Sequence, residues 1–397
     1  MIRSKQLSYL FGLIGALLMT SCINSPARTG MSATVVDALR FGDDAAYVRP
    51  TAPMDFVFPR DHGPHPAYRT EWWYYTGNLT DEAGQAYGYQ LTFFRSALAP
   101  DAPQRASDLA TNQLYMAHFA LTDAAADRYQ SFERFSRGAG GLAGAQGEPS
   151  YQVWLEDWSA SAVTTDTMRL QARAEGEIGT VALDLTMRET RPIVLHGDQG
   201  LSHKGGDVGN ANYYYSLVQM ATTGTVTMGE KVATVTGRSW MDHEFGTSAL
   251  TGDTTGWDWF AVQLDDGTAL MFGEFHNADG ENRSVYEGTL AYPVDDPMAG
   301  RQVTLGAGAF QLEALDTWTS PRSGITYPHG WHVTFPEYAI ELEIQPLIPD
   351  QELAVSFVYY EGATTVTGTR DGKPIQGVGY VELTGYGAKS DNVRSGQ

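Results

Sequence analysis

The chain has 397 residues and a formal net charge of −21, with 21 Tyr, 16 Phe, 9 Trp and 43 Gly. So acidic a chain offers no basic surface to a phosphate backbone, which excludes nucleic acid as a partner. The length predicts about two domains. Abundant aromatic residues and Gly, without long amphipathic repeats, are typical of a chain of many short strands.

The first 22 residues have the features of an export signal. Arg3 and Lys5 supply positive charge, residues 7–19 form an apolar run, and Cys22 ends a small-residue processing site. The run is shorter than the roughly 20 residues of a membrane-spanning helix. Cys22, the only cysteine, stands where a bacterial lipoprotein signal carries its lipid, and Ile23 after it resembles lipoproteins sent to the outer membrane. We expect export and a lipid anchor at Cys22; a cleaved signal with a chance cysteine is the alternative.

Residues 23–54 are polar, Ala-rich and aperiodic, which favours a flexible tether between membrane and body. We expect one domain at residues 55–250 and a second at residues 251–388. With a single cysteine, no disulfide framework can hold them together, so their stability must come from hydrophobic cores.

The body reads as a series of strands. Alternating or aromatic-rich runs predict strands at residues 71–79, 86–95, 113–121, 151–160, 168–174, 180–188, 213–221, 232–237, 257–264, 269–275, 285–292, 309–314, 330–335, 338–345, 354–360, 363–370 and 377–383. Asp-Gly pairs at 266–267 and 371–372 predict tight turns between strands. No segment keeps a helical period beyond about three turns. The fold is predicted to be all-β.

An internal repeat relates two of these hairpins. Trp72, Tyr74, Tyr75, Leu79 and Asp81 match Trp257, Trp259, Phe260, Leu264 and Asp266 at a constant offset of 185 residues. A repeat of this length indicates duplicated domains rather than a solenoid. Two barrels or strongly curved sheets would satisfy it, and a barrel of about eight strands can hold one small ligand.

The most informative segment runs from Arg238 to Gly246, where Asp242, His243 and Glu244 stand next to Trp240. In a strand, Asp242 and Glu244 share one face and His243 takes the other. An acid directed into an aromatic cavity is either a proton donor or a buried structural group. In the structural alternative, Asp242 and Glu244 bind the backbone or Arg238, and the tryptophans fill a barrel floor.

These motifs resemble a known family. FPRDHGPHPAYRTEWWYYTGNL near the start of the body, SWMDHEFG in the middle and the following GWDWF are similar to the carotenoid 1,2-hydratase and AttH-like secreted proteins, over roughly residues 56–386. The resemblance implies two tandem lipocalin-like β-barrel domains. Relatives include hydratases that add water across an isoprenoid double bond, fungal pericyclases, and secreted proteins found with ABC-transporter components.

The resemblance also suggests site residues. The hydratases' key tyrosine and aspartate align with Trp240 and Asp242, and an upstream His/Trp pair falls near Tyr213 and Tyr215. Only Asp242 is retained by identity, so the hydratase pattern is incomplete. The candidate catalytic residues are Asp242, His243 and Glu244, and the candidate ligand-binding residues are Trp240, Tyr213, Tyr215, Trp257, Trp259, Trp72 and Trp73.

Other chemistries find less support. Asp61, His62 and His65 lie in a loop-like spacing without the helical i, i+4 pairing of a zinc-protease motif, and we expect no metal. No Gly-Xaa-Ser-Xaa-Gly elbow occurs, which argues against a lipase-type serine hydrolase. Residues 205–209 do not form a phosphate loop, and no cofactor is expected.

Two functions follow from these observations. We favour an envelope protein that binds an apolar isoprenoid or lipid ligand, with ABC-transporter components as possible partners. The alternative is a hydratase in which Asp242 donates the proton, His243 or Glu244 assists water, and Trp240, Tyr213 and Tyr215 shape the pocket.

Overall fold

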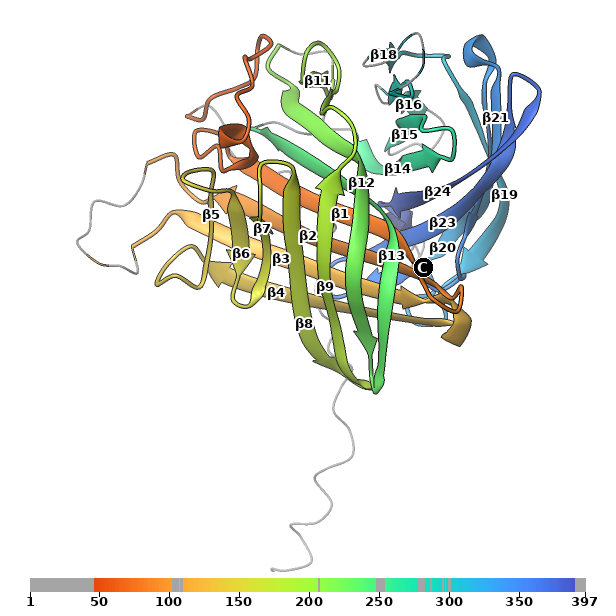
Figure 1. Cartoon of the computed structure of the whole chain (residues 1–397). Helices are drawn as coiled ribbons and strands as arrows, with labels where there is room; N and C mark the ends of the chain where they lie inside the picture. Colours follow the sequence, from red (N-terminus) through yellow and green to blue (C-terminus); the bar gives the residue numbers. More distant parts are fainter. Residues whose placement is uncertain are drawn as a thin grey trace, which may run out of the picture. The chain divides into compact units, whose positions relative to one another are not determined.

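The computed structural model describes residues 46–101, 107, 110–205, 208–247, 254–277, 283–285, 288–294, 296, 298 and 301–389. The predicted signal peptide, Cys22, most of the predicted tether and the predicted boundary at 250/251 lie outside these residues. Every described strand belongs to one of two antiparallel sheets (Figure 1). No helix among the described residues is long and apolar enough to cross a membrane.

The first sheet has thirteen strands, in the order β4-β3-β2-β1-β13-β12-β9-β8-β7-β6-β5, with β10 and β11 also paired to β12. Their bounds are β1 (Thr70–Asp81), β2 (Ala86–Ala97), β3 (Gln113–Asp123), β4 (Arg128–Arg137), β5 (Ala143–Gln146), β6 (Gln152–Leu155), β7 (Trp158–Ala162), β8 (Thr167–Gly176), β9 (Gly179–Glu189), β10 (Val194–Leu195), β11 (Leu201–His203), β12 (Ala211–Met228) and β13 (Lys231–Gly246). The sheet curves so far that edge strand β4 contacts β6, which makes a nearly closed barrel.

The second sheet has eleven strands, in the order β18-β17-β15-β14-β24-β23-β21-β20-β19, with β16 paired to β15 and β22 to β23. Their bounds are β14 (Thr254–Leu264), β15 (Ala269–Asn277), β16 (Arg283–Val285), β17 (Gly288–Ala291), β18 (Gln302–Leu305), β19 (Gln311–Thr319), β20 (Thr326–Phe335), β21 (Ile340–Pro346), β22 (Glu352–Ala354), β23 (Val358–Arg370) and β24 (Lys373–Leu383). Short 3-10 turns occupy Arg60–His62, Ala124–Ala126, Pro336–Tyr338 and Tyr386–Lys389.

The two sheets repeat one strand order. In the first, β1 lies between β2 and β13, and the β12–β13 hairpin leads on to β9, β8 and β7. In the second, β14 lies between β15 and β24, and the β23–β24 hairpin leads on to β21, β20 and β19. The strands β1 and β14 carry the matching aromatic segments at the offset of 185 residues. The all-β fold and its tandem architecture are confirmed.

Alternation along the strands separates two kinds of core. One face of each sheet packs on itself, giving a cluster around Trp73 and Trp158 in the first sheet and another around Phe260 and Trp331 in the second. The opposite faces meet in a third cluster that contains residues of both sheets: Tyr74, Val194, Tyr214, Val218, Trp240, Trp259, Ala261, Ala269, Met271, Phe275, Ala291, Ala363 and Tyr380. A strand such as β13 therefore serves two cores at once.

Three strand predictions differ from the structure. The segment 151–160 is two strands, because Glu156 adopts a left-handed conformation, with φ of 57°, and closes a turn between β6 and β7. The segments 354–360 and 363–370 are mostly one strand, β23. Gly362 does not break it; a Cβ there would lie 2.5 Å from the Tyr360 ring, so Gly permits close packing. The edge strand β4, largely half-exposed, was not predicted.

Residues at the end of the predicted tether lie against the first sheet. The Tyr47 hydroxyl donates to the Ala97 carbonyl at 2.9 Å, and the Tyr213 hydroxyl donates to the Ala52 carbonyl at 2.8 Å. The chain is thus already attached to the body from Tyr47 onward.

Candidate functional site

Strand β13 presents its two faces to different surroundings. On one face, Trp240 contacts Trp259 of the second sheet in a T-shaped arrangement, with ring centroids 6.4 Å apart. On the other, His243 Nε2 lies 2.8 Å from Glu71 Oε1 within the first sheet. Asp242 shares the face of Trp240 because side chains alternate along a strand. The motif therefore directs Asp242 between the sheets and His243 into the first sheet.

The predicted site residues divide between these two regions. The region between the sheets, called here the inter-sheet site, receives Trp72, Trp240, Asp242, Glu244, Trp257 and Trp259. The interior of the first sheet receives Trp73, Tyr213, Tyr215 and His243. The structure does not bring the two groups together in one pocket.

Asp242 is held by three hydrogen-bond donors and is only 3% exposed. Its Oδ1 accepts from Trp240 Nε1 at 2.6 Å and from the Ser216 hydroxyl. Its Oδ2 accepts from the Tyr214 hydroxyl at 3.0 Å. Ser216 Oγ also lies 2.6 Å from His196 Nε2, which extends the hydrogen-bonded chain. The carboxyl group is therefore fixed in orientation by neighbouring strands of one sheet.

Burial raises the pKa of Asp242 to about 7, against an ordinary value of 3.8, because it outweighs the three donors that stabilise the anion. Burial lowers the pKa of His196 to about 3, so its imidazole is neutral. A protonated Asp242 can donate to Ser216, whose own hydrogen can then pass to His196. The site accommodates the neutral carboxylic acid, which is the form that can deliver a proton.

Two further acids of the inter-sheet site were not predicted. Glu361 and Glu382 are cross-strand neighbours on β23 and β24. Glu361 Oε2 accepts from the Tyr74 hydroxyl of the first sheet at 2.7 Å, and Glu382 Oε1 accepts from Trp257 Nε1 at 3.0 Å. Burial raises the pKa of Glu361 well above its ordinary value. Burial raises the pKa of Glu382 to about 8, and the charge of Asp242 adds to the rise.

Asp242 and Glu382 occupy equivalent positions in the two sheets. Asp242 pairs with Tyr74 on β1, and Glu382 pairs with Trp259 on β14. Tyr74 and Trp259 correspond through the 185-residue offset, and their rings lie in T-shaped contact with centroids 5.4 Å apart. Two acids thus approach one aromatic region from opposite sheets.

Glu244 has a different environment from Asp242. Its Oε1 lies 2.6 Å from Lys204 Nζ and accepts from Asn212 Nδ2 at 2.7 Å. Arg238, the partner considered for both acids, instead donates from Nη1 to the Leu264 carbonyl at 3.1 Å. Glu244 is therefore a charge-paired group, whereas Asp242 has only neutral donors in contact.

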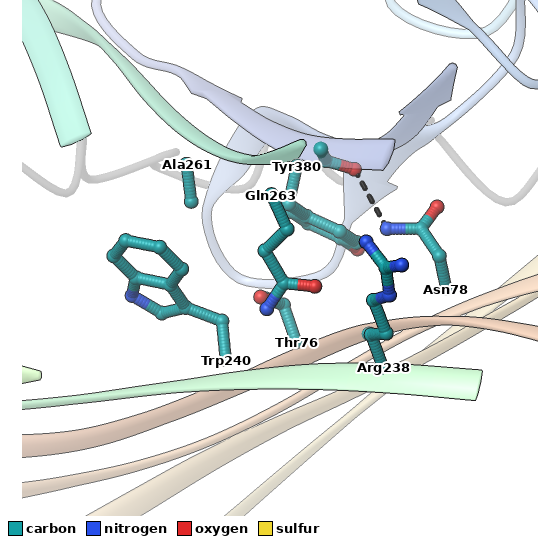
Figure 2. Close-up of a pocket in the computed structure, with 9 residues that line it drawn as sticks. Thr76, Asn78, Arg238, Trp240, Ala261, Gln263 and Tyr380 are labelled. Atoms are coloured by element: carbon teal, nitrogen blue, oxygen red, sulfur yellow. Dashed lines mark hydrogen bonds between the residues drawn. The ribbon is translucent and has the colours of Figure 1, made fainter. Parts of the chain in front are cut away.

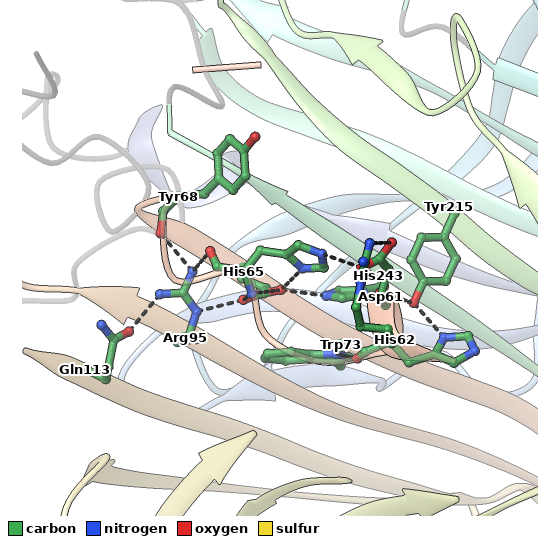
Figure 3. Close-up of polar contacts among 11 residues, drawn as sticks. Asp61, His62, His65, Tyr68, Trp73, Arg95, Gln113, Tyr215 and His243 are labelled. Carbon is green, nitrogen blue, oxygen red and sulfur yellow. Dashed lines mark hydrogen bonds and ion pairs between the residues drawn. The ribbon is translucent and has the colours of Figure 1, made fainter. Parts of the chain in front are cut away.

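A second cluster of buried polar groups, called here the interior network, lies inside the first sheet (Figure 3). Glu71 Oε1 lies 2.9 Å from His65 Nδ1 and 2.8 Å from His243 Nε2, and its Oε2 accepts from Arg95 Nε at 2.7 Å. Burial opposes ionisation of Glu71, but the Arg95 charge and the histidine hydrogen bonds hold its pKa well below the ordinary value. Glu71 is therefore an ionised acid, unlike Asp242.

The interior network fastens the loop before β1 to the sheet. Arg95 Nη2 donates to the Tyr68 carbonyl at 2.8 Å, and Trp73 Nε1 donates to the His62 carbonyl at 2.8 Å. His62 Nδ1 lies 2.7 Å from the Tyr215 hydroxyl. The Asp-His-Gly-Pro-His loop thus has its polar groups satisfied by the barrel that it closes.

The interior network also contains the donor set best suited to a metal among the described residues. Donor atoms of His65, Glu71 and His243 lie within 4.8 Å of one another. These atoms already hydrogen-bond each other, and the Arg95 guanidinium on Glu71 opposes a divalent cation. The geometry is that of a hydrogen-bonded ion-pair network.

The missed acids carry a signal in the sequence that is weak but identifiable. Glu71 and Glu382 each stand in a strand whose other residues are mostly apolar or aromatic. An acid at such a position is rare unless it is paired or functional. Alternation also places Tyr380 and Glu382 on one face, as it places Trp240 and Asp242.

Comparison with known proteins gives one family. The AttH-like family model matches residues 49–386. Kievitone hydratase of Fusarium solani subsp. phaseoli is 24% identical over 245 residues, which are 58% of this chain and 64% of that enzyme, so the chain spans less than two thirds of the relative.

Solved structures agree. A Nitrosomonas europaea protein provisionally named AttH has 33% identity and a TM-score of 0.73, over 85% of this chain and 100% of that one. Kievitone hydratase from Nectria haematococca shares the fold at 15% identity, with a TM-score of 0.63 over 85% of this chain and 95% of that one. The described fold and the extent of the family match lead to one assignment: the chain belongs to the AttH-like family.

Proposed function

We propose that this protein binds an apolar, unsaturated small molecule between its two sheets and adds water to a double bond, or removes it, by acid catalysis. The observation that carries the proposal is Asp242, a buried carboxyl group with a pKa of about 7 among Trp240, Trp259 and Tyr214. The hydratase among its sequence relatives supports the same class of reaction.

The first step is protonation of the alkene. Neutral Asp242 gives its proton to one alkene carbon, the π electrons form the new C–H bond, and the other carbon becomes a carbocation. The ring faces of Trp240, Trp259 and Tyr74 surround this region. Each desolvated aromatic face can stabilise a cation by up to about 2 kcal/mol. The aromatic lining is thus suited to the charge that the acid creates.

Water then completes the addition. Its oxygen attacks the cation and its proton passes to a carboxylate, so that alkene and water become an alcohol. We assign the second acid–base role to Glu382, which is half-buried beside Trp257 and electrostatically coupled to Asp242. His243 lies on the opposite face of β13, and Glu244 is paired with Lys204.

The decisive experiment separates binding from chemistry. Native mass spectrometry of the purified protein, with lipid extraction, identifies a co-purifying ligand, and that ligand is tested for hydration. Asp242→Asn should bind the ligand with little change and abolish turnover. Trp240→Ala and Trp259→Ala should lose the ligand. Unchanged turnover in folded Asp242→Asn would refute the acid role, and a ligand that is bound but never hydrated would identify a carrier.

We also propose that the protein acts at the cell envelope through a lipid at Cys22. The apolar run before that cysteine and its small-residue context support this placement. Labelling of producing cells with a fatty acid should mark the wild type and leave Cys22→Ser unlabelled. Label retained in the variant would refute the anchor.

A further inference from the structure

A small polar pocket adjoins the inter-sheet site. It is lined by Thr76, Gly77, Asn78, Arg238, Trp240, Ala261, Gln263, Gly379 and Tyr380, from both sheets (Figure 2). Figure 2 shows the Arg238 side chain extending from β13 towards Tyr380 and Asn78. Nothing in the proposed acid–base chemistry uses this pocket.

Buried polar atoms in the pocket wall lack hydrogen-bond partners. They are Thr76 Oγ1, the Tyr380 hydroxyl oxygen and Asn78 Oδ1. The side chains of Thr76 and Tyr380 are 1% and 3% exposed. Leaving a buried polar group unpaired costs roughly 1–3 kcal/mol, so a wall with several such groups is matched to a polar partner. The two hydroxyl groups offer hydrogen-bond donors.

Arg238 adds a positive charge to these donors. Its guanidinium donates to the Leu264 carbonyl, and the described part of the chain gives it no carboxylate partner. Asn78 is held in place by its own donation to the Gly379 carbonyl at 2.9 Å. In a chain of net charge −21, a half-buried arginine beside two free hydroxyl donors is a built anion site. Arginine with hydroxyl donors is well suited to a carboxylate.

The pocket can take a head group but not a whole apolar ligand. Its empty volume is about 190 Å³, whereas ligand pockets typically measure roughly 300–1,000 Å³. Trp240 forms part of its wall and also donates to Asp242, so the pocket opens beside the proposed proton donor. Arg238 and Asp242 are four residues apart on one face of β13, roughly 13 Å between Cα atoms.

From this geometry we propose that the pocket binds the carboxylate head of the substrate, with Arg238, Tyr380 and Thr76 as its ligands. The apolar tail runs along Trp240 and presents a double bond to Asp242. The substrate class is therefore an unsaturated, isoprenoid-like carboxylic acid. The substrate class rests on the proposed hydration, while carboxylate binding itself can be tested without it.

The test compares farnesoic acid with methyl farnesoate by quenching of tryptophan fluorescence. The two probes share a tail and differ in charge. In the wild type, the acid should bind at least about tenfold more tightly than the ester, as a charge-assisted contact predicts. The preference should fall to near unity in Arg238→Gln and decline in Tyr380→Phe. Tyr129→Phe, which removes an unpartnered buried hydroxyl outside the pocket, should keep it.

Tyr380→Phe removes a hydroxyl without a partner, so it should fold at least as well as the wild type. Equal affinity for acid and ester, no binding of either, or a preference that survives Arg238→Gln would overturn the carboxylate proposal. Hydration is scored separately by product mass. An acid preference without product supports the pocket and refutes the proposed reaction, whereas product from both probes at equal affinity does the reverse.

Discussion

At the level of single residues, the two acids Asp242 and Glu71 show how contacts decide ionisation. Both are buried on strands that pair with each other. Asp242 meets the neutral donors Trp240, Tyr214 and Ser216, and its pKa rises. Glu71 meets the Arg95 guanidinium, and its pKa falls. The first can exchange a proton near neutral pH, whereas the second is a permanent anion that holds structure.

The raised pKa of Asp242 predicts a pH-dependent stability. Between about pH 4 and 7 the folded protein keeps this proton, which the unfolded chain releases, so the free energy of unfolding should fall as pH rises. The full effect is at most about 4 kcal/mol. Asp242→Asn should remove this dependence. Urea denaturation at pH 4.5 and 8 measures it, with exposed Asp55→Asn as control. Equal pH dependence in Asp242→Asn and wild type would contradict the prediction.

The paired acid should respond in the opposite way. Glu71→Gln leaves Arg95 buried without its anion, and removing one partner of a buried pair costs roughly 3–5 kcal/mol. We expect a large loss in the free energy of unfolding, measured by denaturant titration. Exposed Glu337→Gln serves as the matched change. A loss below 1 kcal/mol would show that the interior network does not stabilise the fold.

At the level of elements, the contact between β1 and β13 depends on a glycine. A Cβ added at Gly237 would lie 2.1 Å from the Asn78 carbonyl oxygen, so Gly237→Ala must push these strands apart. Overpacking of this kind costs roughly 1–3 kcal/mol. Gly306→Ala, where nothing lies within 4 Å, is the control. Thermal unfolding should show a lower midpoint only for Gly237→Ala; equal midpoints would mean that the strands adjust without cost.

The same scale explains what the sequence could and could not predict. Alternation correctly separated Asp242 from His243, because strand geometry alone fixes that result. It could not place Glu382, because the equivalent of Asp242 lies 140 residues away, not 185. Extra strands between β1 and β13 lengthen the first copy. A comparison at a fixed offset therefore finds the first hairpin of each sheet and loses the last.

The partner of each face was also beyond the sequence. Tyr74 and Glu361 are 287 residues apart, and nothing local indicates that they meet. Trp73, next to Tyr74, was predicted to bind ligand with the same reasoning as Trp72, yet its indole packs on His243 inside the first sheet. Whether an outward face meets solvent or a second sheet is decided by tertiary packing, which composition does not encode.

At the level of the whole molecule, hydrogen bonds join the two sheets. Gln263 Nε2 donates to the Val218 and Ser239 carbonyls, each at 2.9 Å, and His118 Nδ1 lies 2.7 Å from the Tyr359 hydroxyl. The faces they connect are apolar and aromatic. Neither sheet can leave the other without exposing this surface to water. The molecule should therefore behave as one cooperative unit.

This coupling predicts a single unfolding transition. Circular dichroism and tryptophan fluorescence should give the same midpoint in urea, because both sheets unfold together. Gln263→Ala, which removes two inter-sheet hydrogen bonds, should lower that midpoint without splitting the transition. Exposed Gln199→Ala is the comparison variant. Separate midpoints for the two probes in the wild type would show that the sheets are independent.

The equivalent placement of Asp242 and Glu382 has a consequence for how such a site can arise. Two identical subunits related by a symmetry axis would present two acids of one length and one affinity for protons, and neither could specialise. Fusion of the copies in one polypeptide removes that restriction. Here one acid is an aspartate with a pKa of about 7, and its counterpart is a glutamate with a pKa of about 8. Duplication thus turns a symmetric pair of acids into a division of labour between proton donor and proton acceptor.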